Sequence, residues 1–500
     1  MAPFARFRDP WITTLQSQLT STRSELPEYA VSDPGSLILT SRPRSFEVGT
    51  GASIYARSLL PAILNAKKEV ILVTCFWAPS STLTCLSKTL EALAAVRQER
   101  VQHENVAGPD EEVIPPLKIR ICFSSRSLFQ KLLHTSSRDG YTYPPSSWAT
   151  KLGLPSPEVL EAGRIDLQVK SLFFLPFSVM HPKFLIIDRQ KAWLPSCNVS
   201  WESWLEGCVE IAGDAVQGLL RFYYEVWDRD LKRGDQGQVH EGFESQCTNL
   251  KPPQASSIGL SAIQSPASFF IRLEDTTLPT VLLPSSHHRN PQFRPFPWQS
   301  SSKCPPTPLN YAVLRLLEMA ERNIYVQTPN LTCAAVLDAL LDALDRGVNV
   351  TIVTSKNQMV LEQLLTAGTT TSLCLKSLIR RYDRLRDVRW PRDIHGDDDS
   401  RSLADVEAQI GRRGSLKISY FRPRPENRAK GVPEEPVHSH LKLTIVDGQF
   451  TILGSGNMDR ASWFTSQELG VLFQSIDFVA AINNALDEAL DARLDTWFKS

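Results

Sequence analysis

The chain has 500 residues, of which 42% are hydrophobic and 22% are charged. This is the composition of a globular protein large enough for two domains or for one duplicated domain. Its 54 Lys and Arg residues balance 54 Asp and Glu residues. The net charge therefore excludes a general attraction to nucleic acid or to an acidic membrane, and any anion-binding site must be local.

Several features of the chain bear on where the protein resides. Residues 1–20 lack the continuous apolar core of a secretory signal. The longest apolar stretch near the motifs described below, residues 172–180, is far shorter than the roughly 20 residues of a membrane-spanning helix. The nine cysteines show neither zinc spacing nor a disulfide-like pattern, which favours a reducing compartment. We therefore expect an intracellular protein, cytoplasmic or peripheral on membranes.

The elements that follow in chain order occur twice. Residues 60–74 and 314–328 each read as an amphipathic helix that runs into a short β-branched strand. In both copies a second helix follows, with leucines at spacings of three and four, and then a second strand, at residues 117–123 and 348–354. Because strands alternate with helices, we expect a mostly parallel sheet of the α/β class.

This repetition suggests a division of the chain into four parts. We predict an N-terminal extension at 1–45, a first half at 46–233, a Ser/Pro-rich linker at 234–308 and a second half at 309–500. A docked strand is expected within the linker, near residues 269–273. Polar insertions are predicted at 98–116 and 380–414. In the second of these, the acidic run 393–401 is better explained as a solvated loop than as a site for a metal or a basic partner.

Each half carries the same motif in the same frame. The first reads His181-Pro-Lys183-Phe-Leu-Ile-Ile-Asp188, followed after six residues by Pro195-Ser196-Cys-Asn198. The second reads His440-Leu-Lys442-Leu-Thr-Ile-Val-Asp447, followed after six residues by Gly454-Ser455-Gly-Asn457. The motifs lie 259 positions apart and the first strands 254, and so constant an offset indicates a duplication. On a strand, the His and Lys of each motif share one face.

These motifs resemble the signature of the phospholipase D superfamily, H-x-K-x-x-x-x-D followed by G-S-x-N, and Pro195 departs from it where glycine is usual. The resemblance implies two pseudo-symmetric α/β/α sandwich halves with mixed, mostly parallel sheets and one active site at their interface. One chain would then suffice for one site. It also implies metal-independent phosphodiester cleavage through a covalent phosphohistidine, without a cofactor.

The resemblance assigns a role to each motif residue. His181 would be the nucleophile and His440 the acid and base, although pseudo-symmetry allows the reverse. Lys183 and Lys442 would neutralise the phosphoryl oxygens. The phosphate-binding set would be completed by the polar residues of the second motif segments, which are Ser196, Asn198, Ser455 and Asn457.

Acidic residues complete the expected site. Glu468 and Glu210 lie 11 and 12 positions after their asparagines and could orient the imidazoles, with Glu206 as the rival to Glu210. Asp188 and Asp447 belong to the catalytic motifs, and we expect them to hold loop and strand geometry rather than to take part directly. His438 would be a polar neighbour at the rim of the cleft.

Three substrate classes share this chemistry: phospholipid hydrolysis, phospholipid head-group transfer and nucleic-acid cleavage. Aromatic residues beside the motifs could line an acyl-chain entrance or could equally be core; they are Phe173, Phe174, Phe177, Trp201, Trp204, Trp463 and Phe464. Residues 325–330 resemble a strand of cardiolipin-synthase-like members, which favours a lipid substrate, and the lack of spanning helices favours peripheral membrane contact. Against a nuclease stands the neutral charge, apart from the arginine-rich run 380–392. A catalytically inactive lipid-binding scaffold is a further alternative.

Overall fold

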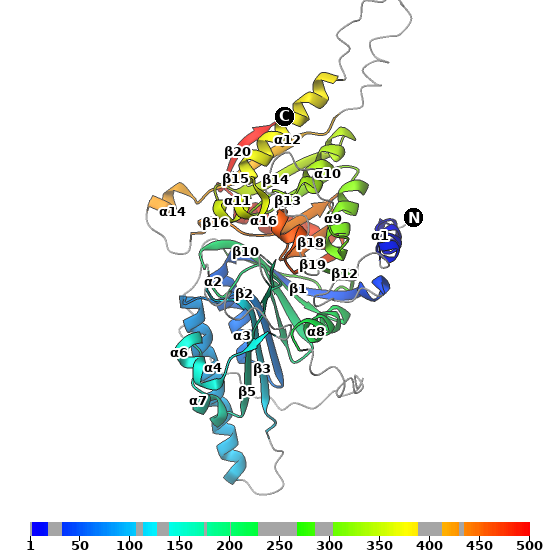
Figure 1. Ribbon diagram of the computed structural model, residues 1–500. Helices are drawn as coiled ribbons and strands as arrows, with labels where there is room; N and C mark the ends of the chain where they lie inside the picture. Colours follow the sequence, from blue (N-terminus) through cyan, green and yellow to red (C-terminus); the bar gives the residue numbers. More distant parts are fainter. Residues whose placement is uncertain are drawn as a thin grey trace, which may run out of the picture.

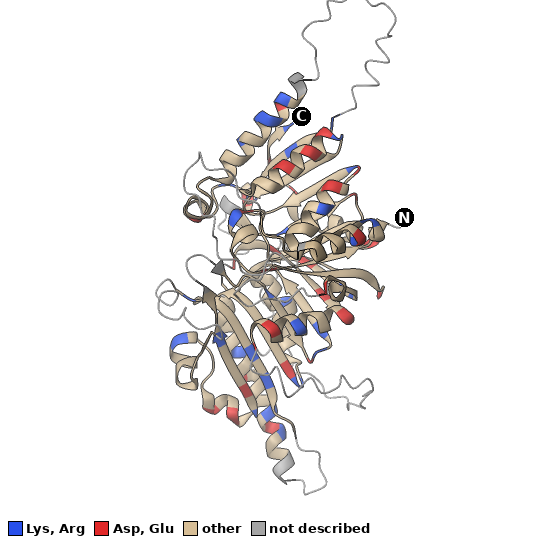
Figure 2. Ribbon diagram, turned by 45° about the vertical axis from the view of Figure 1, so that its right-hand side comes forward, with Lys and Arg blue, Asp and Glu red and all other residues tan. Residues whose placement is uncertain are grey.

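Two similar halves stack to form the molecule, as the computed structural model in Figure 1 shows. The structure describes residues 3–18, 33–106, 114–127, 140–174, 178–200, 202–228, 268–285, 304–388, 413–429 and 435–500. In Figure 2, Lys and Arg are interspersed with Asp and Glu over both halves, in keeping with the zero net charge. Within these ranges, no helix combines the length and the apolar character needed to cross a bilayer.

The two halves repeat one another strand for strand. In the first half the strand order is β5 (Ile165–Ser171), β3 (Leu117–Ser125), β2 (Glu69–Phe76), β8 (Phe184–Ile187), β9 (Lys191–Pro195), β10 (Trp204–Ala212) and β1 (Ile38–Thr50). In the second it is β15 (Leu416–Phe421), β14 (Asn349–Ser355), β13 (Asn323–Gln327), β17 (Leu443–Val446), β18 (Phe450–Gly454), β19 (Glu468–Gln474) and β12 (Leu278–Ser285). The predicted pseudo-symmetric α/β halves are confirmed.

The expectation of mostly parallel sheets is wrong. Only β5, β3 and β2, and likewise β15, β14 and β13, run parallel within the halves that the structure describes. The strands that carry the motifs are joined by tight turns at residues 188–190 and 447–449. A connection that short can only join antiparallel strands. The alternation of helices and strands predicted the parallel part of each sheet and missed these hairpins.

Helices cover both faces of the sheets. Those of the first half are α2 (Gly51–Ile54), η2 (Tyr55–Leu59), α3 (Leu60–Leu64), α4 (Ser81–Val106), η3 (Pro145–Ser147), α6 (Trp148–Leu152), α7 (Pro157–Ala162) and α8 (Asp214–Val226). Those of the second are α9 (Pro308–Met319), α10 (Ala334–Asp345), α11 (Val360–Ala367), α12 (Thr371–Val388), α14 (Pro425–Ala429), α15 (Arg460–Phe464) and α16 (Ile476–Leu490). Strand β2 shows why: Val70 and Leu72 are buried in the core with α3 and α4, whereas Ile71 and Val73 are buried in the core with α8.

Strand β1 joins the two sheets. Its residues 38–41 pair with β12 of the second half, and residues 42–50 pair with β10 of the first. The predicted boundary at residue 45 therefore falls inside a strand. The segment predicted as a linker also contains the expected docked strand, β11 (Phe269–Arg272), and the integral strand β12. Two prolines, Pro279 and Pro284, made β12 read as linker, since proline cannot donate to a sheet ladder.

The remaining elements extend this framework. Helix α1 (Pro3–Gln18) packs on α9 through the buried side chains of Phe7 and Trp11, and η1 (Pro34–Leu37) precedes β1. The short strands are β4 (Tyr141–Thr142), β6 (Phe173–Phe174), β7 (Ser178–Val179), β16 (His438–Ser439) and β20 (Leu494–Lys499). Helices α4 and α12 extend into the two predicted polar insertions, whereas the acidic run 393–401 lies outside the described residues.

Candidate active site

Each histidine motif is attached to the opposite half of the molecule by backbone hydrogen bonds. Strand β16, which ends just before His440, pairs in parallel with the start of β10 in the first half, and the His440 N–H donates to Leu205 O at 2.8 Å. In the same way the His181 N–H donates to Gln467 O at 3.0 Å, next to β19 of the second half. The interface between the halves therefore brings the two motifs together.

The imidazole ring of each histidine is likewise held by a glutamate of the opposite half. His181 Nδ1 lies 2.8 Å from Glu468 Oε2, and His440 Nδ1 lies 2.7 Å from Glu206 Oε1. All four side chains are largely buried, and His181 is the more accessible of the two histidines, at 13% side-chain exposure against 3% for His440. A carboxylate at Nδ1 fixes the proton there and leaves Nε2 as the reactive nitrogen.

The serines of the motifs contact these glutamates. Ser196 Oγ donates to Glu206 Oε2 and accepts the Gly207 N–H, and Ser455 Oγ donates to Glu468 Oε2 and accepts the Leu469 N–H. Because both the donor and an acceptor position of each hydroxyl are used in this way, the prediction that the serines bind phosphate is corrected: they hold the glutamates. Pro195 does not displace Ser196, whose N–H donates to Gly207 O at 2.8 Å.

The choice of Glu210 as an imidazole-orienting residue is wrong. Glu210 lies near the far end of β10, where its carboxylate pairs with Lys191, and Glu206 takes the position at His440. The similar spacings of 11 and 12 residues after the two asparagines were misleading. Helix α15 lengthens the connection to β19 in the second half, whereas a turn makes the corresponding connection in the first. Equivalent glutamates consequently lie at unequal distances along the chain.

Two buried lysines complete the charged cluster. Lys183 Nζ donates to His181 O at 2.9 Å and Lys442 Nζ donates to His440 O at 2.6 Å. Burial lowers the pKa of Lys442 to about 7, although Glu206 favours its charged form. The charge of each lysine also lowers the pKa of the histidine in the other half, as expected if all four groups share one site.

Burial and nearby charge set the protonation of the His–Glu pairs. Burial, together with the two lysines, lowers the pKa of His181 and lowers that of His440 to about 3. Burial raises the pKa values of Glu206 and Glu468, but for each of them the histidine partner, a lysine and the motif serine together outweigh burial, and both values are lowered. Without substrate the site therefore contains two carboxylates and neutral imidazoles.

The two asparagines differ in their contacts. Asn198 Oδ1 accepts the N–H groups of Cys75 and Phe76, so its buried Nδ2 is left to donate. Asn457 Nδ2 donates to Asp459 Oδ2 at 3.0 Å. Within the described residues, Asn198 Nδ2 and Asn457 Oδ1 have no hydrogen-bond partner. Asp459, which also caps α15, was missed; its position two residues after Asn457 was the signal in the sequence.

The motif aspartates lie away from the reacting groups. The Asp188 carboxylate accepts the backbone N–H groups of residues 67–69, and the Asp447 carboxylate accepts those of residues 321–323. Both residues have positive φ, of 52° and 53°, which aspartate tolerates better than most residues do. The prediction that grouped Asp188 and Asp447 with the catalytic residues is thus corrected. The expectation that they hold loop and strand geometry agrees with these contacts.

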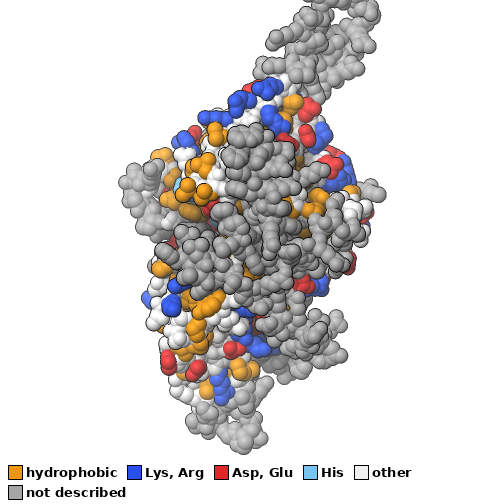
Figure 3. Space-filling model, viewed as in Figure 1, with side chains coloured by type: hydrophobic (Ala, Val, Ile, Leu, Met, Phe, Trp, Pro, Cys, Tyr) orange, Lys and Arg blue, Asp and Glu red, His pale blue; other side chains and the backbone are white. Residues whose placement is uncertain are grey.

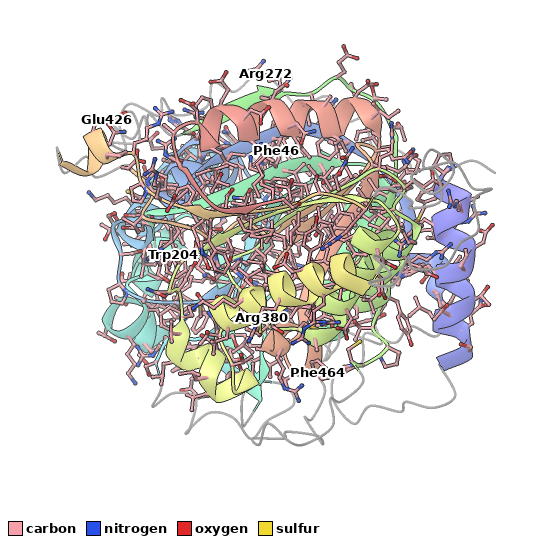
Figure 4. The ribbon with its side chains drawn as sticks, turned by 90° about the horizontal axis from the view of Figure 1, so that it is seen from above. Phe46, Trp204, Arg272, Arg380, Glu426 and Phe464 are labelled. Atoms are coloured by element: carbon pink, nitrogen blue, oxygen red, sulfur yellow. The ribbon has the colours of Figure 1, made fainter. Side chains whose placement is uncertain are left out.

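The neighbouring aromatic residues divide into two groups. Phe173 and Trp463 are core residues, and Phe464 is buried beneath Arg460. Trp204, labelled in Figure 4, packs against the ring of His440 with centroids 4.8 Å apart, and it also makes a T-shaped contact with His438. The side chains of Phe174, Phe177 and Trp201 lie outside the described part of the chain. In the described part, no group of three or more His, Cys, Asp and Glu side chains is arranged to hold a metal ion.

Comparisons with known proteins place part of the chain in a family. Residues 313–490 match the family model described as cardiolipin synthase, PLD-like domain. A search of curated protein sequences found no match.

Solved structures are similar at low sequence identity. Phosphatidylserine synthase from Haemophilus influenzae Rd KW20 aligns over 97% of this chain and 92% of its own, with 12% identity and a TM-score of 0.49. Polyphosphate kinase from Porphyromonas gingivalis aligns over 88% and 46%, with 11% identity and a TM-score of 0.42. Nuc, a phospholipase D family member from Salmonella typhimurium, aligns over 38% and 90%, with 16% identity and a TM-score of 0.24.

The structural role of Asp447 can be tested by substitution. We expect Asp447→Ala to lower the free energy of unfolding by about 2–4 kcal/mol, because three backbone N–H groups lose their acceptor and alanine is strained at positive φ. Asp342→Ala, at an exposed position of α10, is the matched control and should change stability by less than about 0.5 kcal/mol. Denaturant unfolding measures both. Equal stability of the two variants would contradict the assigned role.

Proposed function

We propose that this chain, whose residues 313–490 match a cardiolipin synthase, PLD-like domain, is a member of the phospholipase D superfamily and a metal-independent phosphodiesterase that acts on phospholipids, by hydrolysis or by head-group transfer. The observation that carries the proposal is the crossed pair of His–Glu contacts, His181 with Glu468 and His440 with Glu206, beside two buried lysines. This set supplies a nucleophile, a proton donor and cationic partners for a phosphoryl group.

The first step forms a phosphohistidine. His181 Nε2 attacks phosphorus while the bond from phosphorus to the leaving alcohol breaks, and protonated His440 donates its Nε2 proton to the departing oxygen. The greater exposure of His181 supports its assignment as nucleophile. The anionic phosphodiester favours the protonated form of His440, so His440 takes up a proton from solvent when the substrate binds and then acts as the acid. Lys183, Lys442 and Asn198 Nδ2 stabilise the charge that develops on the phosphoryl oxygens.

The second step releases the phosphoryl group. His440, now neutral, accepts a proton from water or from an acceptor alcohol, whose oxygen attacks phosphorus as the bond to His181 Nε2 breaks. Water gives hydrolysis and an alcohol gives head-group transfer. Glu206 and Glu468 keep the Nδ1 protons in place through both steps, which leaves Nε2 as the nitrogen that reacts in each ring.

The lipid class is supported by the family match and by the charge distribution. The matching model is described as cardiolipin synthase, PLD-like domain, and cardiolipin is a phospholipid. The chain carries no net charge with which to hold a polyanionic nucleic acid. The arginine-rich helix α12 is the local exception, and it leaves nuclease activity as the second candidate.

A substrate panel tests the proposal. Purified protein is incubated in chelator with phosphatidylcholine, phosphatidylglycerol, cardiolipin or single-stranded DNA, with and without a primary alcohol. We expect head-group release or transfer from lipid that survives chelation, because none of the proposed steps uses a metal. His181→Ala and His440→Ala should each lower it by at least about a thousandfold.

The matched control is His438→Ala, since His438 lies two residues before His440, makes a T-shaped contact with Trp204 and takes part in none of the proposed steps. This variant should retain most of the activity. Cleavage of DNA alone would reassign the protein to the nucleases, and turnover of neither substrate would favour an inactive scaffold.

The lowered pKa of Lys442 predicts a pH dependence. Burial brings this pKa to about 7, so Lys442 is protonated below pH 7 and loses its charge, and its attraction for the phosphoryl group, as the pH rises. Arginine stays protonated throughout. On a soluble phosphodiester, we compare kcat/KM of the wild type with kcat/KM of Lys442→Arg at each pH. The wild-type value divided by the variant value should fall by roughly tenfold per pH unit above about pH 7.5. A constant ratio from pH 6 to 9 would contradict this assignment.

A further inference from the structure

Helix α11 is turned with its apolar face toward solvent. Leu361 is 72% exposed, Leu365 53% and Leu364 46%, and Val360 at the start of the helix is 36% exposed. The side chain that faces inward is Gln363, which is buried and hydrogen-bonded to Asn330, Gln358 and Thr371. A surface helix normally shows the opposite arrangement. An exposed apolar patch of this kind marks a site of contact with a protein or a membrane.

A basic stripe continues this surface. Leu373, near the start of α12, is 54% exposed. Lys376, Arg380 and Arg384 are also exposed, and they follow at spacings of three and four, so the four side chains lie along one side of the helix. Figure 3 shows blue side chains over the upper part of α12, with orange side chains below and to the left of them. Apolar side chains flanked by cations fit an anionic lipid surface.

Buried hydrogen bonds and helix packing connect this surface to the candidate active site. Gln363 Nε2 donates to Asn330 Oδ1 at 2.8 Å, and Asn330 Nδ2 lies 3.5 Å from Asp459 Oδ2, which accepts a hydrogen bond from Asn457. Helix α11 also packs against α15, which begins three residues after Asn457. Figure 4 shows α11, α12 and α15 together on one side of the molecule, where Arg380 and Phe464 are labelled.

We propose that the exposed face of α11 with Leu373, together with the basic stripe of α12, is the surface on which the protein docks to an anionic phospholipid bilayer. The apolar side chains enter the head-group region, and Lys376, Arg380 and Arg384 pair with lipid phosphates. The proposal rests on the proposed lipid substrate and adds the route by which that substrate reaches the site. A bilayer docked on α11 lies beside α15 and Asn457, so a lipid phosphate can enter the site while its acyl chains remain in the membrane.

The test measures binding of the full chain to vesicles of phosphatidylcholine with phosphatidylglycerol, and to vesicles of phosphatidylcholine alone. We expect Leu361→Glu with Leu365→Glu to weaken binding to the anionic vesicles by at least about tenfold. Arg380→Glu with Arg384→Glu should weaken it by about tenfold at low salt, with little effect on neutral vesicles. Hydrolysis of a soluble phosphodiester should stay within about twofold of wild type in both variants, since neither changes a residue of the site.

The matched control is Ile476→Glu. Ile476 is 67% exposed at the start of α16, and Figure 4 shows α16 on the opposite side of the molecule from α11. This variant should bind vesicles as wild type does. Wild-type binding by the Leu361/Leu365 variant would overturn the docking surface even if the soluble substrate is cleaved. If this variant binds vesicles normally and has also lost a dimer that the wild type forms in sedimentation, α11 contacts a second copy of the chain, which would also overturn the docking surface.

The two proposals can fail separately. If the wild-type protein binds anionic vesicles through α11 but cleaves neither soluble nor vesicular phosphodiesters, the docking surface stands and the proposed function falls.

Discussion

The site depends on one arrangement: each imidazole is held by a carboxylate from the other half of the chain. His181 contacts Glu468 and His440 contacts Glu206, and backbone hydrogen bonds next to each contact join the same segments. Neither half therefore contains a complete catalytic unit, although each contains a complete motif. Strand β1, which pairs with both sheets, and the apolar core that continues through both halves keep this interface in register.

Burying so many charges is favourable only because they compensate one another. Glu206, Glu468, Lys183 and Lys442 are each less than 5% exposed, and an unpaired charge at any of these positions would be strongly destabilising. In the proposed mechanism the two carboxylates and two lysines are close to balance and the imidazoles are neutral, so the negative charge of a phosphodiester favours the uptake of a proton from solvent by His440. The electrostatics of the site are thus suited to an anionic ligand, and they couple its binding to this proton uptake.

Much of this arrangement could be predicted from the sequence, because the duplicated motif and the hydrophobic periodicity are local signals. The errors have a common origin in long-range structure. Glu210 was preferred to Glu206 because spacing along the chain does not reveal that α15 lengthens only one of two equivalent connections. The serines were assigned to phosphate because their partners, Glu206 and Glu468, lie on the neighbouring strands. Strand β12 was hidden by its prolines, and its pairing with β1 is non-local.

The departures from symmetry distinguish the two sides of the site. Asp459 and α15 occur only in the second half of the described chain, beside the exposed α11, while Trp204 of the first half packs on His440. The exchange of carboxylates between the halves can be tested by comparing the kcat of Glu206→Gln with that of Glu210→Gln on a soluble phosphodiester. We expect a loss of about a hundredfold or more for Glu206→Gln, as when the partner of a catalytic imidazole is neutralised, and near-normal activity for Glu210→Gln. Near-normal activity of Glu206→Gln, or a comparable loss in Glu210→Gln, would contradict this exchange.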